Sequence, residues 1–157
     1  MKDLAARVLN LAKAKGVTIA TVESCTGGMV SAALTAIPGS SAVFERGWAT
    51  YSNQAKHDEV GVSMDLLTAY GAVSEQVAIA MAEGALNTCP ATLTVSITGI
   101  AGPDGGSAAK PVGLVHFACA LRGQPTVHRN EIFAGSRDEV RAQAAFTALS
   151  MLESRLL

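Results

Sequence analysis

The sequence has little of what marks membrane, secreted or nucleic-acid-binding proteins. Its 12 basic and 13 acidic residues leave a formal net charge of −1, so no basic excess is present to neutralise nucleic-acid phosphates. No stretch approaches the roughly 20 uncharged apolar residues of a membrane-spanning helix. We therefore expect neither a nucleic-acid partner nor a membrane partner.

Cysteine is scarce as well. Only Cys25, Cys89 and Cys119 occur, an odd number without CxxC spacing, which predicts neither a disulfide framework nor a zinc site. The amino-terminal segment 1–16 alternates charged with apolar residues and lacks the apolar core of a signal peptide. Together these features indicate a protein of the reducing cytoplasm.

Apolar residues, in contrast, make up 49% of the 157 positions, whereas charged residues make up only 16%. A chain of this length can bury about two-thirds of its unfolded surface around one core. We expect a single domain over residues 1–157. The high apolar content in so short a chain also predicts a homo-oligomer.

Segments with helical spacing of apolar residues alternate with short β-rich runs. The helical pattern covers residues 4–16, 29–37, 74–85 and 136–152, and the β-rich runs cover 18–22, 44–52, 93–97, 113–121 and 126–133. Such alternation is typical of the α/β class. We predict a three-layer α/β/α sandwich with a mixed central sheet.

Several helix starts are marked by capping residues. Asn53 is placed to cap a short helix that runs through His57, and Ser63 and Ser74 are placed to cap two more. Ser136 precedes a glutamate by three residues, which is the spacing of a capping box.

A serine lies where the first predicted strand turns into a helix, in the run ESCTGG at 23–28. Ser24 at such a turn is exposed at the sheet edge, and the first helical N–H groups beside it are free to stabilise an oxyanion. Gly27 and Gly28 would let a substrate approach this backbone closely. The local sequence is equally compatible with a serine that only caps the helix.

A glycine-rich run follows the strand at 93–97. Consecutive N–H groups of residues 102–106 could cradle a phosphate, because glycine permits the required backbone angles and close approach. The lysine of a GxxxxGK[ST] loop is missing, so nucleoside-triphosphate hydrolysis is not indicated. A plain turn is the alternative interpretation.

Cys25 is the alternative nucleophile, since a thiol at a helix N-terminus can have a lowered pKa. With Glu23 and Lys56 it would supply the residue types of a nitrilase-like amidase, although nitrilase sites draw on distant segments of a longer chain. The histidines fall singly, without the spacing of metal ligands, and are expected to be packing or surface residues: His57, His116 and His128.

Taken together, several runs resemble the CinA C-terminal family in their order and spacing. They are ESCTGG at 23–28, YSNxAK at 51–56, GAVSE at 71–75, SITGIAGPDGG at 96–106, KPVG at 110–113, and Arg137 at the start of the last helix. The resemblance extends from about Ala5 to Arg155. Active members of the family are nicotinamide-nucleotide amidases, and longer CinA proteins carry a further nucleotide-hydrolysing domain for which this chain is too short. The resemblance implies conversion of nicotinamide mononucleotide (NMN) and water to nicotinate mononucleotide and ammonia, without a cofactor or metal.

The resemblance also implies catalytic roles. Ser24 is the nucleophile, Lys56 the base that takes its proton, and Tyr51 a neighbour that relays or orients this proton. A free lysine has a pKa of about 10.4, so a lysine base needs burial or nearby positive charge to lower it. We therefore expect Lys56 to be at least partly buried. Without the resemblance, Lys56 would be interpreted as a solvated lysine and Tyr51 as a strand-packing residue.

The predicted substrate contacts fall into two groups. Backbone N–H groups near Thr26 and Gly27, next to Gly28, would hold the oxyanion. Candidates for ribose or phosphate contacts are Thr98, Gly99, Gly102, Asp104, Gly105, Gly106 and Arg137. Two other functions stay open: an amidase with another small amide substrate, and a non-catalytic nucleotide-binding module.

Overall fold

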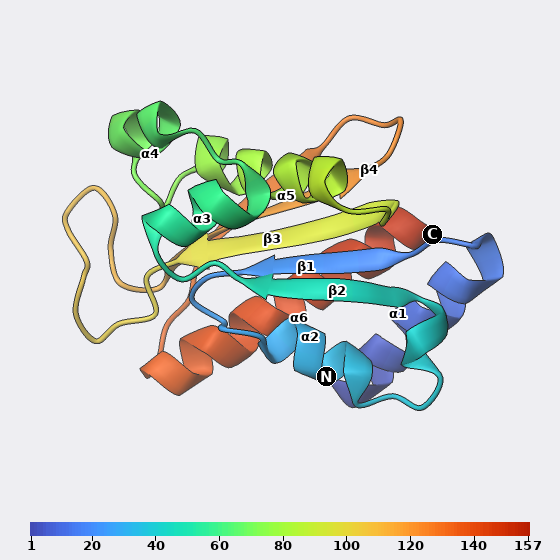
Figure 1. The fold of residues 1–157 in the computed structure, drawn as a ribbon. Helices are drawn as coiled ribbons and strands as arrows, with labels where there is room; N and C mark the ends of the chain where they lie inside the picture. Colours follow the sequence, from blue (N-terminus) through green and yellow to red (C-terminus); the bar gives the residue numbers. More distant parts are fainter.

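A five-stranded mixed sheet forms the centre of the computed structural model, which describes residues 1–157 (Figure 1). The strand order is β2-β1-β3-β4-β5. The first three strands in this order are parallel, and β4 and β5 run antiparallel to their neighbours. The strands are β1 (Ile19–Glu23), β2 (Phe44–Ala49), β3 (Leu93–Gly99), β4 (Leu114–Leu121) and β5 (Val127–Ile132). The predicted mixed sheet is confirmed.

Helices cover both faces of the sheet (Figure 1). One face carries α1 (Lys2–Lys15), α2 (Met29–Thr35) and α6 (Arg137–Leu156), with a 3-10 turn at Ser40–Ala42. The other carries α3 (Asn53–Val60), α4 (Met64–Tyr70) and α5 (Glu75–Thr88). The fold is therefore the predicted α/β/α arrangement of three layers.

The central strands β1 and β3 are buried along almost their whole length. The polar residues of β3 are satisfied within the core, because Thr94 and Ser96 donate hydrogen bonds to the Ala82 and Ala78 carbonyls of α5 at 2.7 and 2.6 Å. Small side chains on this face let α5 pack close to the sheet. This packing holds the carboxyl ends of β1 and β3 in fixed positions.

Most of the predicted caps are confirmed, but one is wrong. Ser63, Ser74 and Ser136 cap α4, α5 and α6, and Ser136 forms the full capping box. Ser52, rather than Asn53, caps α3: its backbone is extended, and its side chain accepts the Ala55 N–H.

Several element boundaries also differ from the prediction, and three of them lie between residues 35 and 60. Strand β2 ends at Ala49 instead of residue 52, and α2 ends at Thr35 before residue 37. Helix α3 continues past residue 57 to Val60, where Gly61 in a left-handed conformation ends it. The shorter β2 leaves residues 50–52 free to form the connection that positions α3.

The order of the strands reverses at β1. From β1 the chain passes through α2 on one face to β2, and then through α3, α4 and α5 on the other face to β3 on the opposite side of β1. In open α/β sheets, ligands bind in the crevice outside the carboxyl ends of the strands at such a reversal. Ser24, the residue after β1, lies at this point.

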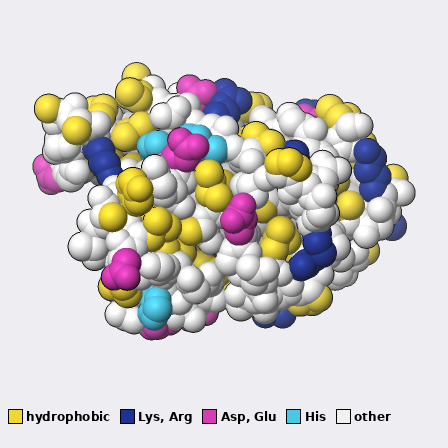
Figure 2. Space-filling model, turned by 90° about the horizontal axis from the view of Figure 1, so that it is seen from above, with side chains coloured by type: hydrophobic (Ala, Val, Ile, Leu, Met, Phe, Trp, Pro, Cys, Tyr) yellow, Lys and Arg dark blue, Asp and Glu magenta, His cyan; other side chains and the backbone are white.

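The surface shows no concentration of positive charge on the face formed by α3, α4 and α5. Figure 2 shows lysine and arginine side chains scattered over this face among apolar and uncharged groups. None of the helices combines the length and the apolar character needed to cross a membrane.

Candidate active site

Ser24 and Lys56 come together although 32 residues separate them. Lys56 extends from near the start of α3 toward the end of β1, and its Nζ lies 3.1 Å from Ser24 Oγ. The same Nζ donates a hydrogen bond to the Thr50 carbonyl oxygen at 2.7 Å. A neutral amine in this position can donate to that carbonyl and offer its lone pair to the serine hydroxyl. This is the geometry of a nucleophile and its base.

Burial gives Lys56 the acidity that this role requires. Only 1% of the residue is exposed, and no carboxylate pairs with it. Burial lowers the pKa of Lys56 from its usual 10.5 to about 8. A substantial fraction of the lysine is therefore neutral near physiological pH and able to accept a proton.

Cys25 has the opposite property. Burial raises the pKa of its thiol to about 11, so that the thiolate needed for nucleophilic attack is scarce at neutral pH. No hydrogen bond joins this thiol to Lys56. The arrangement favours the serine over the adjacent cysteine as nucleophile.

Glu23 is engaged elsewhere. Its buried carboxylate accepts hydrogen bonds from the N–H groups of Gly28, Val30 and Ser31 and from the Ser31 hydroxyl, at 2.9 to 3.1 Å. It satisfies the free N–H groups at the start of α2 and forms no hydrogen bond or ion pair with Lys56. The residues of a nitrilase-like site are present, but they are not arranged as one.

A cavity of about 230 Å³ opens in front of the Ser24–Lys56 pair. Its lining combines the nucleophile turn, the start of α3, the end of β3 and the start of α6: Ser24, Cys25, Tyr51, Lys56, Ala72, Val73, Thr98, Gly99, Ala101 and Arg137. A larger hollow of about 470 Å³ lies between β5 and α6, but it contains no paired nucleophile and base. The chemistry therefore selects the smaller cavity.

Of the four backbone N–H groups that follow Ser24, at residues 25–28, two have protein acceptors and two do not. Gly27 N–H donates to the Ser24 carbonyl at 3.0 Å, and Gly28 N–H donates to the buried carboxylate described above. Both glycines have a positive φ angle, 60° and 111°, which residues with a side chain rarely adopt. The N–H groups of Cys25 and Thr26 stay free of protein partners. The oxyanion donors expected near Thr26 and Gly27 are thus available at Thr26 but engaged at Gly27.

Tyr51 and Arg137 form a pair at the mouth of the cavity. The Arg137 guanidinium donates to the Tyr51 hydroxyl at 3.1 Å and to the Gly102 carbonyl at 2.9 Å. Tyr51 is 62% exposed, and its hydroxyl makes no hydrogen bond to Ser24 or Lys56. The proton-orienting role of Tyr51 stays a prediction, whereas its contact with Arg137 is visible.

Thr98 and Gly99 line the cavity from the end of β3. The Thr98 hydroxyl donates to the Ala72 carbonyl at 2.8 Å and so ties the strand to the segment before α5. At Gly99 a Cβ would lie 2.6 Å from a Val115 methyl group of β4. This glycine is needed for close strand packing, whether or not it contacts a ligand.

The glycine-rich loop lies mostly outside the cavity. Asp104, Gly105 and Gly106 line a separate hollow of about 440 Å³, in which Asp104 is the only charged residue. A Cβ at Gly102 would lie 2.5 Å from a Val112 methyl group, so packing within the loop accounts for this glycine. The structure brings Ser24, Tyr51, Lys56, Thr98, Gly99 and Arg137 to one cavity, but not the predicted phosphate cradle.

The chain matches a known family and known proteins over nearly its whole length. The profile of the CinA C-terminal domain matches residues 1–156. The chain belongs to the CinA C-terminal domain family. It is 50% identical over 157 residues to the nicotinamide-nucleotide amidohydrolase PncC of Escherichia coli K12, covering all of this chain and 95% of that protein. A CinA-like protein of Geobacter sp. strain M21 is 50% identical over 151 residues, which are 96% of this chain and 36% of that protein.

A solved member of the family has the same fold. The crystal structure of the competence/damage inducible protein CihA from Agrobacterium tumefaciens superposes with a TM-score of 0.95 at 47% identity, over 98% of this chain and 93% of that one. The fold predicted from the alternation of helices and strands is therefore that of the CinA family.

Two elements of this CinA-domain site were not predicted from the sequence. The Thr50 carbonyl holds Lys56, and Arg141 of α6 contacts the turn after Ser24. A backbone carbonyl leaves no trace in residue identity. Arg141 is one turn after Arg137, so its position near the start of the last helix was the only available signal.

The structure also pairs two histidines that are separate in sequence. His116 Nδ1 and His128 Nε2 lie 3.0 Å apart on neighbouring strands, and Glu75 lies 3.8 Å from His128. Burial lowers the pKa of His116, and the neighbouring His128 and Lys110 lower it further. None of these groups lines the Ser24 cavity.

The burial of Lys56 has a measurable cost in stability. The pKa of Lys56 is about 8 in the folded chain, against 10.5 for an exposed lysine. Below pH 8 this difference lowers the free energy of unfolding by about 3 kcal/mol. We expect Lys56→Met to raise the free energy of unfolding at pH 7 by up to about this amount. From pH 8 to 10.5 the unfolded chain binds more protons than the folded one, so the wild type should gain stability and the difference should shrink.

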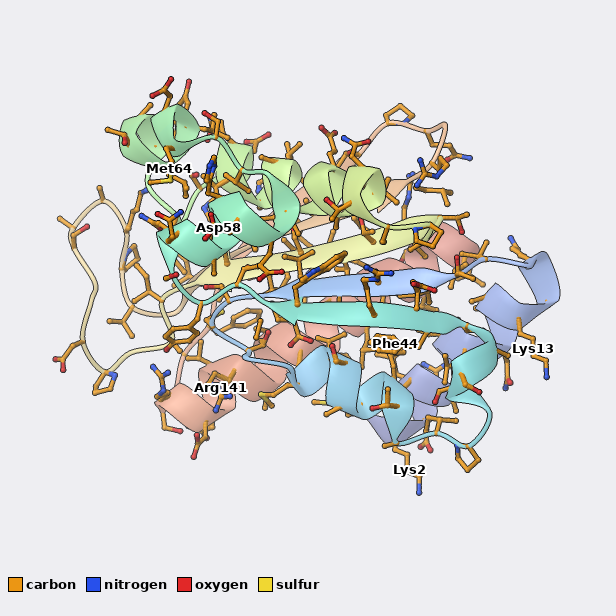
Figure 3. The ribbon with its side chains drawn as sticks, viewed as in Figure 1. Lys2, Lys13, Phe44, Asp58, Met64 and Arg141 are labelled. Carbon is orange, nitrogen blue, oxygen red and sulfur yellow. The ribbon has the colours of Figure 1, made fainter.

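Chemical denaturation at pH 7 and pH 10 measures this effect. The matched control is Lys13→Met, because Lys13 is exposed on α1 (Figure 3) and its replacement should change stability by less than about 0.5 kcal/mol. If Lys56→Met were less stable than the wild type at pH 7, the expectation that the buried amine destabilises the fold would be wrong.

Proposed function

We propose that this protein is an NMN amidohydrolase, which converts NMN and water to nicotinate mononucleotide and ammonia. The observation that carries the proposal is the buried Lys56 amine 3.1 Å from Ser24 Oγ, in a cavity at the strand-order reversal. The E. coli relative at 50% identity bears the name of this activity. A buried serine–lysine pair is suited to hydrolysis of a carboxamide.

Acylation is the first half of the proposed reaction. Neutral Lys56 accepts the Ser24 hydroxyl proton while Oγ attacks the carboxamide carbon, and a tetrahedral oxyanion forms. When this intermediate collapses, the C–N bond breaks and Lys56 returns the proton to the departing nitrogen. Ammonia leaves, and the nicotinoyl group is esterified to Ser24.

Deacylation repeats these steps with water. Lys56 accepts a proton from the water that attacks the ester carbon, and then returns it to Ser24 Oγ as the C–O bond breaks. The free carboxylic acid leaves and the enzyme is regenerated. No cofactor takes part in either half.

The Cys25 and Thr26 N–H groups are the proposed oxyanion donors. They follow the nucleophile directly and have no protein acceptor, so they are free to bind a developing negative charge. Removal of one such donor in a serine hydrolase costs about 10²- to 10³-fold in kcat. These two groups take the role that residues near Thr26 and Gly27 were expected to fill.

Arg137 is the proposed phosphate contact. It is the only arginine that lines the cavity, and its pair with Tyr51 lies at the mouth. The cavity, at about 230 Å³, is smaller than the roughly 300 Å³ at which ligand pockets usually begin. We infer that the pyridine ring enters it, that Thr98 and Gly99 flank the ribose, and that the phosphate stays at the mouth. There the loop of Gly102, Asp104, Gly105 and Gly106 would approach it beside Arg137.

We further propose that residues 1–157 act as one catalytic domain, in the cytoplasm and as a homo-oligomer. The family match over residues 1–156 supports one domain. The free, buried cysteines fit a reducing compartment. Exposed apolar side chains such as Ile132 and Phe146, 66% and 50% exposed, are suited to contact between copies.

A substrate panel tests the proposed function. Ammonia release should be fastest with NMN, because only this compound presents both the carboxamide and an unmasked phosphate monoester for Arg137. Nicotinamide and its riboside lack the phosphate, and in the dinucleotide this phosphate is joined to a second phosphate through an anhydride bond. The measurement is kcat/KM for each compound, with Ser24→Ala as the background control.

Each outcome of the panel has a distinct meaning. If another amide releases ammonia with a higher kcat/KM than NMN does, that amide is the substrate in place of NMN. If the wild type binds NMN but releases ammonia no faster than Ser24→Ala, the protein is a non-catalytic nucleotide-binding module.

A further inference from the structure

Arg141 holds two carbonyl groups of the turn that carries the nucleophile. Its Nε donates to the Cys25 carbonyl oxygen at 3.0 Å, and its Nη2 donates to the Thr26 carbonyl oxygen at 3.2 Å. Figure 3 shows Arg141 near the start of α6, at the end of the sheet where β1 finishes. The arginine contacts residues 115 and 116 positions away in the chain. It does not line the Ser24 cavity.

The contact with the Cys25 carbonyl determines where one of the free N–H groups, that of Thr26, points. In a trans peptide the C=O and the following N–H point in opposite directions. The Cys25 carbonyl belongs to the same peptide as the Thr26 N–H. With the carbonyl held by Arg141, this N–H is directed away from α6 and is not able to rotate. The hydrogen bond to a cationic donor also polarises the peptide and strengthens its N–H as a donor.

The turn is therefore fixed from two sides. Glu23 binds N–H groups at the start of α2, and Arg141 binds the carbonyls of Cys25 and Thr26. Between them the free Thr26 N–H keeps one orientation beside Ser24. A planar guanidinium is suited to this task because its nitrogens span two acceptors in a fixed geometry, whereas a lysine ammonium is a point charge on a flexible chain.

We propose that Arg141 is a positioning residue that orients the Ser24 turn and the oxyanion-binding N–H group of Thr26. This inference rests on the proposed function, since it assigns Arg141 a part in the same reaction. A misplacement of about 1 Å at reacting groups can cost about 100-fold in rate. The effect should fall on kcat, because the oxyanion exists only after the substrate has bound.

Arg141→Lys and Arg155→Lys form a matched pair of variants. Arg155 lies on the same helix, about 21 Å further along it, and also donates to a backbone carbonyl, that of Pro125. We expect Arg141→Lys to lower kcat for NMN by about 10- to 100-fold with KM within about threefold of the wild type. Arg155→Lys should match the wild type. In Arg141→Ala, added guanidinium ion below denaturing concentration should restore part of kcat, which a loss of folding would not allow.

A second measurement does not depend on the substrate. A sulfonyl fluoride reacts with an activated serine, the hydroxyl losing its proton to the base and fluoride leaving the sulfur. Mass spectrometry should show Ser24 labelled at least about tenfold more slowly in Arg141→Lys than in Arg155→Lys, at equal melting temperature. If the wild type is labelled at Ser24 but releases no ammonia from NMN, the proposed substrate is wrong while the role of Arg141 is still tested. Equal labelling rates and equal kcat in the two lysine variants would overturn the inference.

Discussion

Replacing Ser24 with alanine should reduce ammonia release from NMN to background. The methyl group has no lone pair with which to attack the carboxamide, and burial keeps the Cys25 thiol protonated, with a pKa of about 11. Loss of a catalytic serine costs on the order of 10⁶-fold in kcat in a serine hydrolase. The measurement is kcat under saturating NMN, with the melting temperature compared to confirm folding.

Cys25→Ala and Cys25→Ser are the matched controls for this variant. Both change the neighbouring residue, and both should keep most of the activity, because the proposed mechanism uses the backbone N–H of Cys25 and not its side chain. Loss of activity in the Cys25 variants together with activity in Ser24→Ala would place the enzyme in the thiol class.

Lys56→Arg and Lys56→Ala should each lower kcat by about 10²- to 10⁴-fold, the usual contribution of a general base. Arginine keeps the positive charge and the length, but a guanidinium with a pKa above about 12 does not accept a proton near pH 7. Charge alone therefore does not rescue the reaction. Steady-state kinetics of both variants, with circular dichroism to confirm the fold, measure this effect.

The pH profile gives an independent measure of the same base. Burial lowers the pKa of Lys56 to about 8, and the neutral form is the active one. In the wild type kcat/KM should rise tenfold per pH unit below this value and level off above it. The residual activity of Lys56→Arg should lack this rise. If Lys56→Arg kept most of the activity, Lys56 would be a structural or phosphate contact, and Tyr51 would become the candidate base.

Local patterns predicted the elements well because they depend on neighbouring residues. A helix cap is a hydrogen bond across three residues, so Ser63, Ser74 and Ser136 were recognisable from spacing alone. The error at Asn53 has the same local origin, since Ser52 next to it has an equally good capping side chain and takes the role. Boundaries were predicted less accurately: α3, for example, continues to Val60, where Gly61 in a left-handed conformation ends it.

The candidate site was predicted in part through family motifs. These motifs indicated Ser24, Tyr51, Lys56 and Arg137, and the structure brings all four to one cavity. Spacing was not able to show that the Tyr51 hydroxyl contacts Arg137. Nor did it show that most of the glycine-rich loop lies in a separate hollow.

The sequence by itself determined the α/β class, most of the caps, the strand-to-helix turn at Ser24 and the family. Each of these depends on residues close together in the chain or on motif identity. Only the tertiary structure decided that Lys56 is buried against Ser24, that Cys25 stays protonated, and that Arg141 holds the nucleophile turn. Burial and contacts across 32 or 116 residues depend on strand order and on which helix covers which face. Desolvation then sets the acidity of the lysine, so the chemistry of this site arises from packing.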